Sequence, residues 1–551
     1  MKPGRRHFLL GAAAAAAGGA LGLARSRIVE VRPELRYPGR ELGHALREGA
    51  AWPAPSGVRR AAVAILGSGV AGLSCAWKLA REGWRDFVVV SGPETGGNAA
   101  GGRRRGLDYP LGAHYLPLPS MESVHVREML AALGILERGA DDSRPWYDEA
   151  VIVHAPQERL LRGGRWEDSL LPMTGLPEAE LAQHRRFLQT VAGLHAARGA
   201  DGRKVFAIPV SLSSRDPAWR ALDGLSLRQW LRREGYDAPA LLWYLDYCCR
   251  DDYGADSGAV SAWAGLHYFA SRDGHAANAG DGAVLTWPGG LSALVAAMRA
   301  DISARLGRDD WLLPGSAVRI EPSAAGARVV CAAPGAAGAP RAYALQAGRA
   351  VCAMPVFVAQ RLLPDIRDYG YHPAAHAPPR AAWLVSNFVM DGYPPEMPGE
   401  PLSWDNVVYQ GQGLGYVVST HQLLRVAPSP RTVFTAYHAL SGMAPAQARR
   451  WLENASPEAL RAAASADLTA AYGDAFWRYA RELEITVRGH AMATPAPGYL
   501  SNPGLLALRE ADGPILFAHA DLSGYSVFEE AAWWGVTAAA RVMGGSAAGA
   551  A

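Results

Sequence analysis

The sequence predicts an α/β protein, and three neighbouring segments near its N-terminus carry that prediction. Ala61–Leu66 and Phe87–Val90 are uninterrupted apolar runs, typical of strands buried in a parallel sheet. Between them, Val70–Glu82 places apolar residues at helical spacing and is followed by Gly83, a common helix stop. Because the three segments fit within about 30 residues, they have the size of a strand–helix–strand crossover.

The composition bounds the size and the class of the protein. Of the 551 residues, 49% are hydrophobic and 19% charged, so we expect a large core and several domains and exclude global disorder. The 55 basic residues nearly balance the 52 acidic ones, which argues against a nucleic-acid partner. Five cysteines exclude a disulfide scaffold, and the adjacent Cys248 and Cys249 are expected to be buried thiols.

The first 24 residues have the pattern of an export signal. Adjacent Arg5 and Arg6 precede an uncharged stretch, Leu9–Ala24, which ends in a small-x-small triplet. That stretch is shorter than the roughly 20 residues that cross a bilayer. The arginine pair resembles a twin-arginine signal, so we expect residues 1–24 to direct the protein to the periplasm or otherwise outside the cytoplasm. An uncleaved membrane anchor or a disordered tail is the alternative, and no later stretch is long and apolar enough to span a membrane.

The helices and strands later in the chain are predicted from the same two patterns, apolar residues at helical spacing and uninterrupted apolar runs. Residues 25–57 are a lead-in rich in Arg, Pro and Gly, and residues 119–284 are mainly helical. Helices are expected at Leu291–Leu306, within residues 446–472 and at Glu529–Met543. Strands are expected at Ala317–Ile320, Ala327–Cys331, Arg349–Ala353 and Ile515–Ala518, and residues 381–440 are rich in strands.

A glycine motif, Gly67-Ser-Gly69-Val70-Ala71-Gly72, lies between the first strand and the first helix. In that context, the first glycine allows a tight turn, the second lets the backbone approach a pyrophosphate, and the third lets the helix pack close to the strand. The helix N-terminus then offers free N–H groups to the phosphates. The motif therefore predicts a dinucleotide site, with a merely tight turn as the alternative.

The acid that usually ends the second strand and binds the adenosine ribose is absent. Ser91 follows Val90, and Glu94 lies three residues further on. Ser91 and Glu94 are the candidates for the ribose, although Glu94 is equally well read as a solvated loop charge. No basic cluster suited to an NADP 2′-phosphate follows this strand, so ribose recognition stays open.

Further glycine-rich segments resemble those of the flavin-dependent amine oxidase superfamily. Gly96-Gly97-Asn98 and the following Gly101-Gly102-Arg103 correspond to its glycine turn after the second strand, and Leu111–Tyr115 to the segment that runs beside the flavin. Asn98 stands where the family usually has Arg, and Arg103 is the candidate substitute. The C-terminus resembles the family too: Phe517–Asp521 matches the strand whose acid binds the ribityl chain, and Glu529–Ala531 with Gly535 matches the closing helix.

The resemblance implies FAD as cofactor and a Rossmann-like FAD-binding domain of three ββα layers, joined to a discontinuous α+β substrate domain. It assigns residues 58–118, 285–360 and 510–551 to the FAD-binding domain and residues 119–284 and 361–509 to the substrate domain. Val318 is the expected contact on the adenine side. The residues expected to bind FAD are Gly67, Gly69, Val70, Ala71, Gly72, Ser91, Glu94, Gly96, Gly97, Asn98, Arg103, Gly112, Ala113, His114, Val318, Asp521 and Val527.

The substrate half is less informative. Asp251 and Asp252 stand in a stretch dense in polar groups, and aromatic residues follow it; carboxylates and aromatic faces both attract a cationic amine. A solvated loop backed by a buried aromatic helix is the alternative. This region also resembles, more weakly, exported flavoproteins related to spermidine dehydrogenase. The catalytic candidates are Trp404, Tyr416, Asp251, Asp252, His267 and Tyr525, and no metal-ligand spacing is present.

The sequence thus predicts an exported FAD-dependent oxidoreductase that transfers a hydride from a small substrate, an amine or polyamine, to flavin N5. One alternative keeps the fold but acts on an apolar substrate such as a polyene or a porphyrinogen. Another is a non-catalytic flavin-binding redox partner or assembly protein. Oxygen, a quinone and a redox protein all remain open as the electron acceptor.

Overall fold

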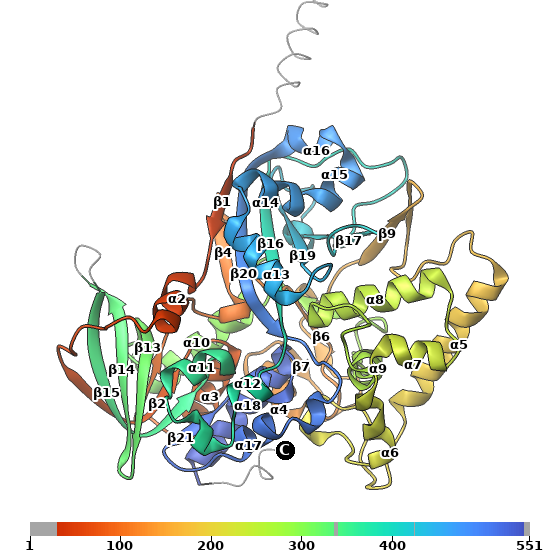
Figure 1. The fold of residues 1–551 in the computed structure, drawn as a ribbon. Helices are drawn as coiled ribbons and strands as arrows, with labels where there is room; N and C mark the ends of the chain where they lie inside the picture. The colour runs from red at the N-terminus through yellow and green to blue at the C-terminus, as the bar shows by residue number, and fades with distance from the viewer. Residues whose placement is uncertain (1–29, 336–339, 424, 545–551) are drawn as a thin grey trace, which may run out of the picture.

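A computed structural model describes residues 30–335, 340–423 and 425–544, and Figure 1 shows its arrangement of two large sheets with a group of helices beside them. The predicted export signal, residues 1–24, lies outside the described residues. Among the helices that the structure describes, none is long and apolar enough to cross a membrane. All five cysteines are buried and free.

The first sheet belongs to the predicted strand–helix–strand unit. Five parallel strands lie in the order β12-β3-β2-β15-β21, and the first half of β15 also continues an antiparallel meander, β13-β14-β15. These strands are β2 (Val58–Leu66), β3 (Phe87–Val90), β12 (Leu312–Leu313), β13 (Ser316–Ser323), β14 (Gly326–Pro334), β15 (Pro340–Cys352) and β21 (Ile515–Phe517). Their apolar side chains form one continuous core with helices α3 (Val70–Arg81), α10 (Ser292–Leu306) and α18 (Phe528–Val542), as expected for strands buried on both faces.

Helix α3 (Val70–Arg81) begins and ends within one residue of its predicted range. It packs between α10 (Ser292–Leu306) and α18 (Phe528–Val542). Gly535 allows the close approach of α18, because a Cβ there would overlap the Ala71 carbonyl oxygen. Nearby lie α4 (Val124–Ala132), α11 (Val356–Leu362), α12 (Pro373–His376) and α17 (Pro503–Glu510).

The second sheet has eight strands in the order β1-β20-β16-β19-β18-β17-β9-β10. The β1–β20 and β17–β9 pairs are parallel and the others antiparallel. The strands are β1 (Pro33–Arg36), β9 (Glu158–Arg162), β10 (Arg165–Glu167), β16 (Arg380–Met390), β17 (Asp405–Val408), β18 (Tyr416–Val418), β19 (Thr432–Ala439) and β20 (Ala480–Ala493). One face packs against α13 (Pro445–Asn454), α14 (Pro457–Ala464), α15 (Ala466–Tyr472) and α16 (Asp474–Tyr479).

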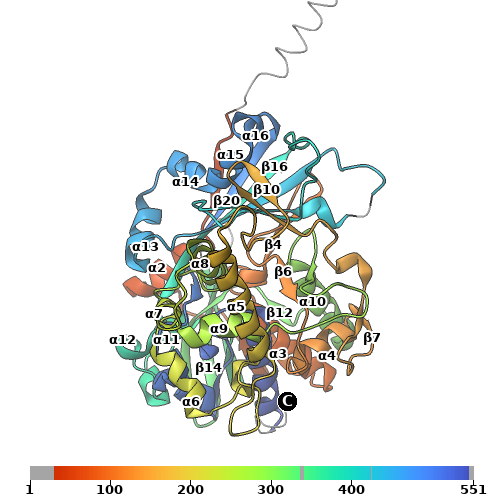
Figure 2. The ribbon, with the colours of Figure 1, turned by 90° about the vertical axis from the view of Figure 1, so that its right-hand side faces the viewer.

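The opposite face of this sheet meets the helical group that faces the viewer in Figure 2. The group comprises α5 (Glu178–His195), α6 (Pro217–Arg220), α7 (Leu227–Arg233), α8 (Pro239–Tyr253) and α9 (Ala262–Ala270). Three small two-stranded sheets complete the fold: β4 (Gly101–Arg104) with β5 (Leu107–Pro110), β6 (Tyr115–Pro117) with β11 (Val284–Thr286), and β7 (Leu136–Arg138) with β8 (Trp146–Tyr147).

The α/β class is therefore confirmed, and three features differ from the expectation. The lead-in contains a strand, β1, and a helix, α2 (Arg40–Glu48), and β1 joins the second sheet. The mainly helical region 119–284 also contributes the β9–β10 hairpin. The long strand β20 was not predicted, because its charged residues interrupt the apolar pattern that marks a buried strand.

Candidate functional site

The glycine motif lies at the carboxyl end of β2, where α3 begins. Gly67 has φ +121°, and Gly69 is the N-cap of α3. A Cβ at Gly72 would overlap the carbonyl oxygen of Gly67, whereas a Cβ at Gly69 would meet nothing within 4 Å. Val70 and Ala71 form the first turn of α3. The loop is therefore tight where helix and strand meet and open at Gly69, the position from which the backbone would approach a phosphate.

The second glycine turn lies directly against the first. Gly69 and Gly96 form a parallel bridge, and the Gly96 N–H donates to the Ser68 carbonyl at 2.9 Å. Asn98 joins this turn to the next segment, because its carbonyl accepts the Ala113 N–H at 2.7 Å. A Cβ at Gly112 would overlap the same carbonyl.

Arg103 is not brought to this place, and the structure corrects that expectation. Its side chain is 70% exposed and lies 3.6 Å from Asp108, because alternate residues of β4 point to opposite sides. Arg488 of β20 reaches the glycine turn instead: its Nη2 lies 3.5 Å from the Gly97 carbonyl oxygen and 2.9 Å from that of Leu111. No local signal could have identified Arg488, which is almost 400 residues from the turn.

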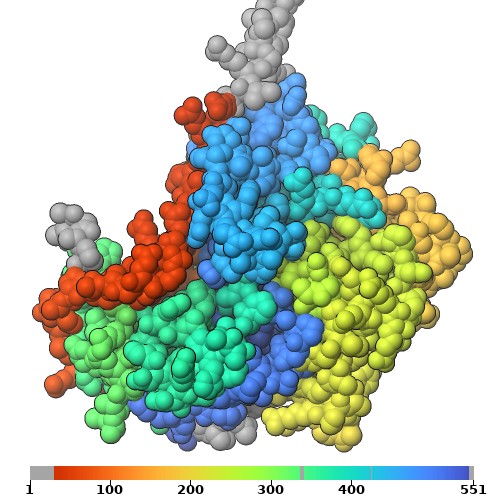
Figure 3. Space-filling model, viewed as in Figure 1, coloured from red at the N-terminus to blue at the C-terminus, as the bar shows by residue number. Residues whose placement is uncertain are grey.

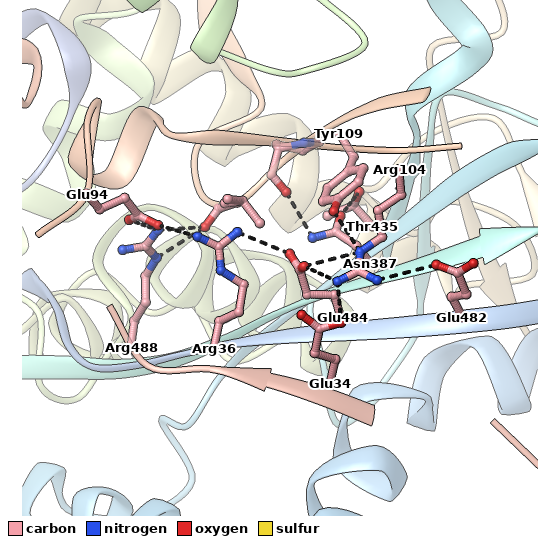
Figure 4. Close-up of polar contacts among 12 residues, drawn as sticks. Glu34, Arg36, Glu94, Arg104, Tyr109, Asn387, Thr435, Glu482, Glu484 and Arg488 are labelled. Carbon is pink, nitrogen blue, oxygen red and sulfur yellow. Dashed lines mark hydrogen bonds and ion pairs between the residues drawn. The ribbon is translucent and has the colours of Figure 1, made fainter. Parts of the chain in front are cut away.

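The two ribose candidates after β3 are both engaged by the protein. The Ser91 hydroxyl lies 3.1 Å from the Gly92 carbonyl oxygen and 3.2 Å from that of Gly315. Glu94 forms ion pairs with Arg488 at 2.7 Å and with Arg36 at 3.5 Å. Figure 4 shows these ion pairs as part of a network that continues through Glu484 and Arg104 and joins the two sheets.

At the C-terminal end, Asp521 is fully buried in the turn after β21. Its Oδ2 accepts the Val356 N–H at 2.9 Å and pairs with Arg380 Nη1 at 2.7 Å. Burial alone would raise the pKa of Asp521, but the charge of Arg380 and the neighbouring His519 hold it well below its ordinary value. Its other oxygen, Oδ1, is buried, accepts no hydrogen bond from the described residues and lies 3.3 Å from His519 Nδ1. A buried carboxylate oxygen in this state is suited to accept a ligand hydroxyl.

Helix α18 begins next to Asp521, with Val527 as its N-cap. Its first turn carries two buried acids, Glu529 and Glu530. Glu530 is held by the Val210 N–H at 2.7 Å and by Ser523. Burial raises the pKa of Glu529 to about 7. Protein groups therefore hold Glu530, whereas burial favours the neutral form of Glu529.

Tyr437 links the glycine-rich segments to the substrate half. The Tyr437 hydroxyl, from β19, donates to the Gly112 carbonyl oxygen at 2.9 Å. The His114 ring stacks on Tyr437 at 4.6 Å between centroids and lies 5.5 Å from Trp404. Burial lowers the pKa of His114 to about 3, so the imidazole is neutral at physiological pH. Tyr115 stands edge-on to Trp404 at 6.1 Å.

Two carboxyl groups, Asp251 of α8 and Asp405 of β17, lie close enough to this aromatic group for their charges to act on the Tyr115 and Tyr437 hydroxyls. Burial, and then the neighbouring charge of Asp252, raises the pKa of Asp251 to about 7. Burial, together with the Asp251 charge, raises the pKa of Asp405 well above its ordinary value. Burial, and then the charges of Asp251 and Asp405, raise the pKa of the Tyr437 hydroxyl well above its ordinary value. Asp405 was missed from the sequence, although its neighbour Trp404 was a candidate.

The partial exposure of these deep side chains indicates that they border an internal space. Asp251, Asp405, His114 and Tyr115 each keep part of their surface accessible to solvent although they lie deep in the protein. Asp252 differs, because it forms an ion pair with Arg272, whose guanidinium stacks over Tyr268 at 4.2 Å. Asp252 is therefore already neutralised by the protein.

Three other catalytic candidates lie elsewhere. His267 is buried in the helical group with its Nε2 2.8 Å from the Ala207 carbonyl oxygen, and burial lowers its pKa to about 3. Tyr525 packs beside it, 3.3 Å from Glu530 Oε1. Tyr416 donates to Tyr472 at 2.7 Å in the core on the opposite face of the sheet. Because strand residues alternate, Val417 rather than Tyr416 points to the face that carries Asp405.

No group of three or more His, Cys, Asp or Glu suited to a metal ion occurs in residues 30–335, 340–423 and 425–544. A model for an NAD(P)-binding Rossmann-like domain matches residues 65–133. A comparison with curated proteins gave no match.

Solved structures resemble the chain over most of its length. Putrescine oxidase bound to putrescine has a TM-score of 0.61 at 15% identity, covering 88% of this chain and 100% of that one. Cyclohexylamine oxidase from Brevibacterium oxydans has a TM-score of 0.57 at 18% identity, covering 88% and 98%. A fatty acid isomerase from P. acnes has a TM-score of 0.53 at 15% identity, covering 86% and 97%. The chain thus has the fold of these amine oxidases, with a Rossmann-like dinucleotide-binding domain joined to a domain built on a mixed sheet.

Proposed function

We propose that the protein is an FAD-dependent oxidoreductase and that its substrate is an amine. The observation that carries the proposal is the pair of deep carboxyl groups, Asp251 and Asp405, in an aromatic space that Tyr437 connects to the glycine-rich segments. The fold agrees with this proposal, because two of the similar structures are a putrescine oxidase and a cyclohexylamine oxidase.

The residues present fit FAD at two separate places. Gly69 leaves its position open at the N-terminus of α3, where a pyrophosphate would lie. Asp521 offers a buried carboxylate oxygen that accepts no hydrogen bond from the described residues, suited to a ribityl hydroxyl. NAD-type cofactors would leave the second feature unused. When bound, FAD would supply the two-electron acceptor, by taking a hydride from the substrate.

Charge supports an amine as the substrate. Two carboxyl groups that repel each other in a poorly solvated place favour a bound cation, because its charge offsets their mutual repulsion and part of the cost of their desolvation. The aromatic faces of Trp404 and Tyr437 add a further attraction for a cation. Asp251, with a pKa of about 7, is suited to accept the proton of a bound ammonium group.

The reaction then follows from a neutral amine. With its lone pair free, the substrate releases a hydride from the adjacent carbon and becomes an iminium ion, which water hydrolyses to a carbonyl compound and an amine or ammonia. The neutral His114 stacked on Tyr437 fixes one wall of the space without placing a competing positive charge there. Tyr437 holds that wall against the Gly112 segment.

A second candidate keeps the fold and takes an apolar substrate. It is favoured by the aromatic lining and by the similarity to a fatty acid isomerase. Asp251 and Asp405 weigh against it: neither forms an ion pair among the described residues, and an apolar substrate would leave both carboxyl groups buried and unpaired. We also propose export through the twin-arginine-type signal. The electron acceptor is then oxygen, a quinone or a redox protein.

The test is anaerobic reduction of the flavin in the purified protein, followed by absorbance. We expect oxidised-flavin bands, release of FAD on heating, and bleaching by putrescine, spermidine or cyclohexylamine. Asp405→Asn should slow bleaching by a factor of about 30 or more, as for loss of one partner of a buried charge pair. The matched control, Asp512→Asn, changes an exposed acid and should bleach at the wild-type rate. Bleaching by a fatty acid and by no amine would establish the second candidate instead.

A further inference from the structure

The lead-in crosses the loop that follows β3. Arg36 Nη2 lies 3.5 Å from Glu94, and at Gly39, where φ is +70°, a Cβ would lie 3.0 Å from Pro93 Cγ. In a dinucleotide-binding fold, the carboxyl end of this strand is where the adenosine half of the cofactor is held. The lead-in therefore passes directly beside the expected adenosine position.

Helix α2 then packs over the expected adenine contact. Leu42 and Leu46 of α2, together with Trp52, pack in one apolar cluster with Val318, Val330 and Ala342. Val318 lies at a shift in the β13–β14 register, between the paired residues Ala317 and Arg319. The backbone N–H and C=O groups of Val318 therefore lie outside the regular β13–β14 pairing, as in a β-bulge.

The lead-in is fixed at both ends and lightly packed between them. At one end, β1 pairs with β20 from Pro33↔Leu483 to Arg36↔Thr486. At the other end, the Ser56 N–H and hydroxyl both donate to the Ala342 carbonyl oxygen, at 2.9 and 3.1 Å. Helix α2 between them has no fully buried residue. Figure 3 shows this segment lying along the molecular surface beside the meander.

We propose that the middle part of the lead-in, residues 36–52, closes the adenosine end of the dinucleotide site and holds the adenosine half of the cofactor there. The inference rests on the dinucleotide cofactor of the proposed function. It accounts for the missing acid after β3: Glu94 anchors Arg36 of the lead-in, as Figure 4 shows, and the adenosine is retained by a covering segment instead. Because β1 belongs to the second sheet, this closure also ties the cofactor to the substrate domain.

Limited digestion with trypsin tests the closure on the whole protein. Arg40 and Arg47 are exposed residues of α2, and Arg198 is an exposed residue of the helical group that serves as an internal control. We expect ADP and FAD each to slow cleavage after Arg40 and Arg47 at least tenfold relative to the cofactor-free protein. FMN, which lacks the adenosine, should not slow it, and cleavage after Arg198 should change less than twofold with every ligand.

The outcomes separate this inference from the proposed function. If FAD binds, as measured by flavin absorbance after gel filtration, but Arg40 and Arg47 are cleaved at unchanged rates, the closure is refuted while the flavin assignment stands. If neither FAD nor ADP binds in equilibrium dialysis, both the closure and the proposed flavin-dependent function are refuted. Protection by FMN equal to that by ADP would likewise overturn the closure, because it would trace the effect to the flavin end.

A variant provides an independent measurement. Leu42→Ser with Leu46→Ser removes the apolar contact of α2 with Val318, and Leu506→Ser, on the exposed side of α17, is the matched control. We expect the double variant to bind ADP at least tenfold more weakly by calorimetry and the control to bind it as the wild type does. ADP affinity within twofold of wild type in the double variant would overturn the inference.

Discussion

Replacing Asp251 by asparagine should make the protein more stable at alkaline pH. The carboxyl group has a pKa of about 7 in the folded chain, because it is buried and lies beside Asp252. In the unfolded chain the pKa is about 4. The folded protein therefore retains a proton between about pH 4 and pH 7 that the unfolded chain has released, and stability falls as the pH rises through this window.

At pH 8, the difference between the two pKa values corresponds to a loss of about 4 kcal/mol in the free energy of unfolding. This is an upper value, since Asp251 keeps some contact with solvent. Near the melting temperature, the free energy of unfolding of a chain of this size changes by about 1 kcal/mol per degree. Asp251→Asn should therefore melt up to about 4 °C above the wild type at pH 8. At pH 4 the difference in melting temperature should nearly vanish, because the carboxyl group is protonated in the folded chain and about half protonated in the unfolded chain.

The assay is thermal unfolding followed by tryptophan fluorescence at pH 4, 6 and 8, with Asp512→Asn as the exposed control. The gain in melting temperature should appear only in the Asp251 variant and should grow with pH. A variant that melts below the wild type at pH 8 would refute the reasoning, because it would mean that the carboxylate is compensated in the folded protein. A stabilised variant that no longer reduces the flavin would indicate that the destabilising group is kept for function.

Three further predictions concern the cofactor, the wall of the site and the destination of the protein. Gly69→Asp should fold with an unchanged melting temperature, since a Cβ there meets nothing within 4 Å. It should lose its flavin absorbance, because the new carboxylate would occupy the phosphate position. Full flavin retention would contradict the cofactor assignment. Tyr437→Phe removes the hydrogen bond to Gly112, worth about 1 kcal/mol, and should lower the rate of flavin reduction, whereas Tyr416→Phe removes a similar bond on the opposite face of the sheet and should leave that rate unchanged. Replacing Arg5 and Arg6 by lysine should retain the protein in the cytoplasm, as cell fractionation would measure; unchanged export would exclude the twin-arginine route.

The elements that could be predicted from the sequence are those whose cause is local. The strand–helix–strand unit follows from two apolar runs and one helical pattern within about 30 residues, and the glycine motif lies where those patterns meet. Strand β20 was missed because Glu482, Glu484 and Arg488 interrupt its apolar pattern. In the folded chain these charges are paired with residues of β1, β4 and the loop after β3, so their partners become known only with the tertiary structure.

The same reason explains what could be predicted of the site. The glycine segments and Asp521 carry recognisable local patterns. Asp251 was a candidate because it stands in a stretch dense in polar groups. Asp405 and Tyr437 carry no such signal, since they come from two strands that meet helix α8 only when the second sheet packs on the helical group. Tyr416 was a reasonable candidate by residue type, but the alternation of side chains along β18 directs it into the opposite core.

The pairing of β1 with β20 has a consequence for biosynthesis. Arg36 lies beside Thr486, so about 450 residues of chain separate the partners. At roughly 5–20 residues per second, the ribosome needs about 20 to 90 s to deliver the second strand after the first. The N-terminal strand must therefore wait unpaired through most of translation, and its docking is among the last steps of folding. A cofactor could enter the nascent protein during that wait and be enclosed only when synthesis is nearly complete.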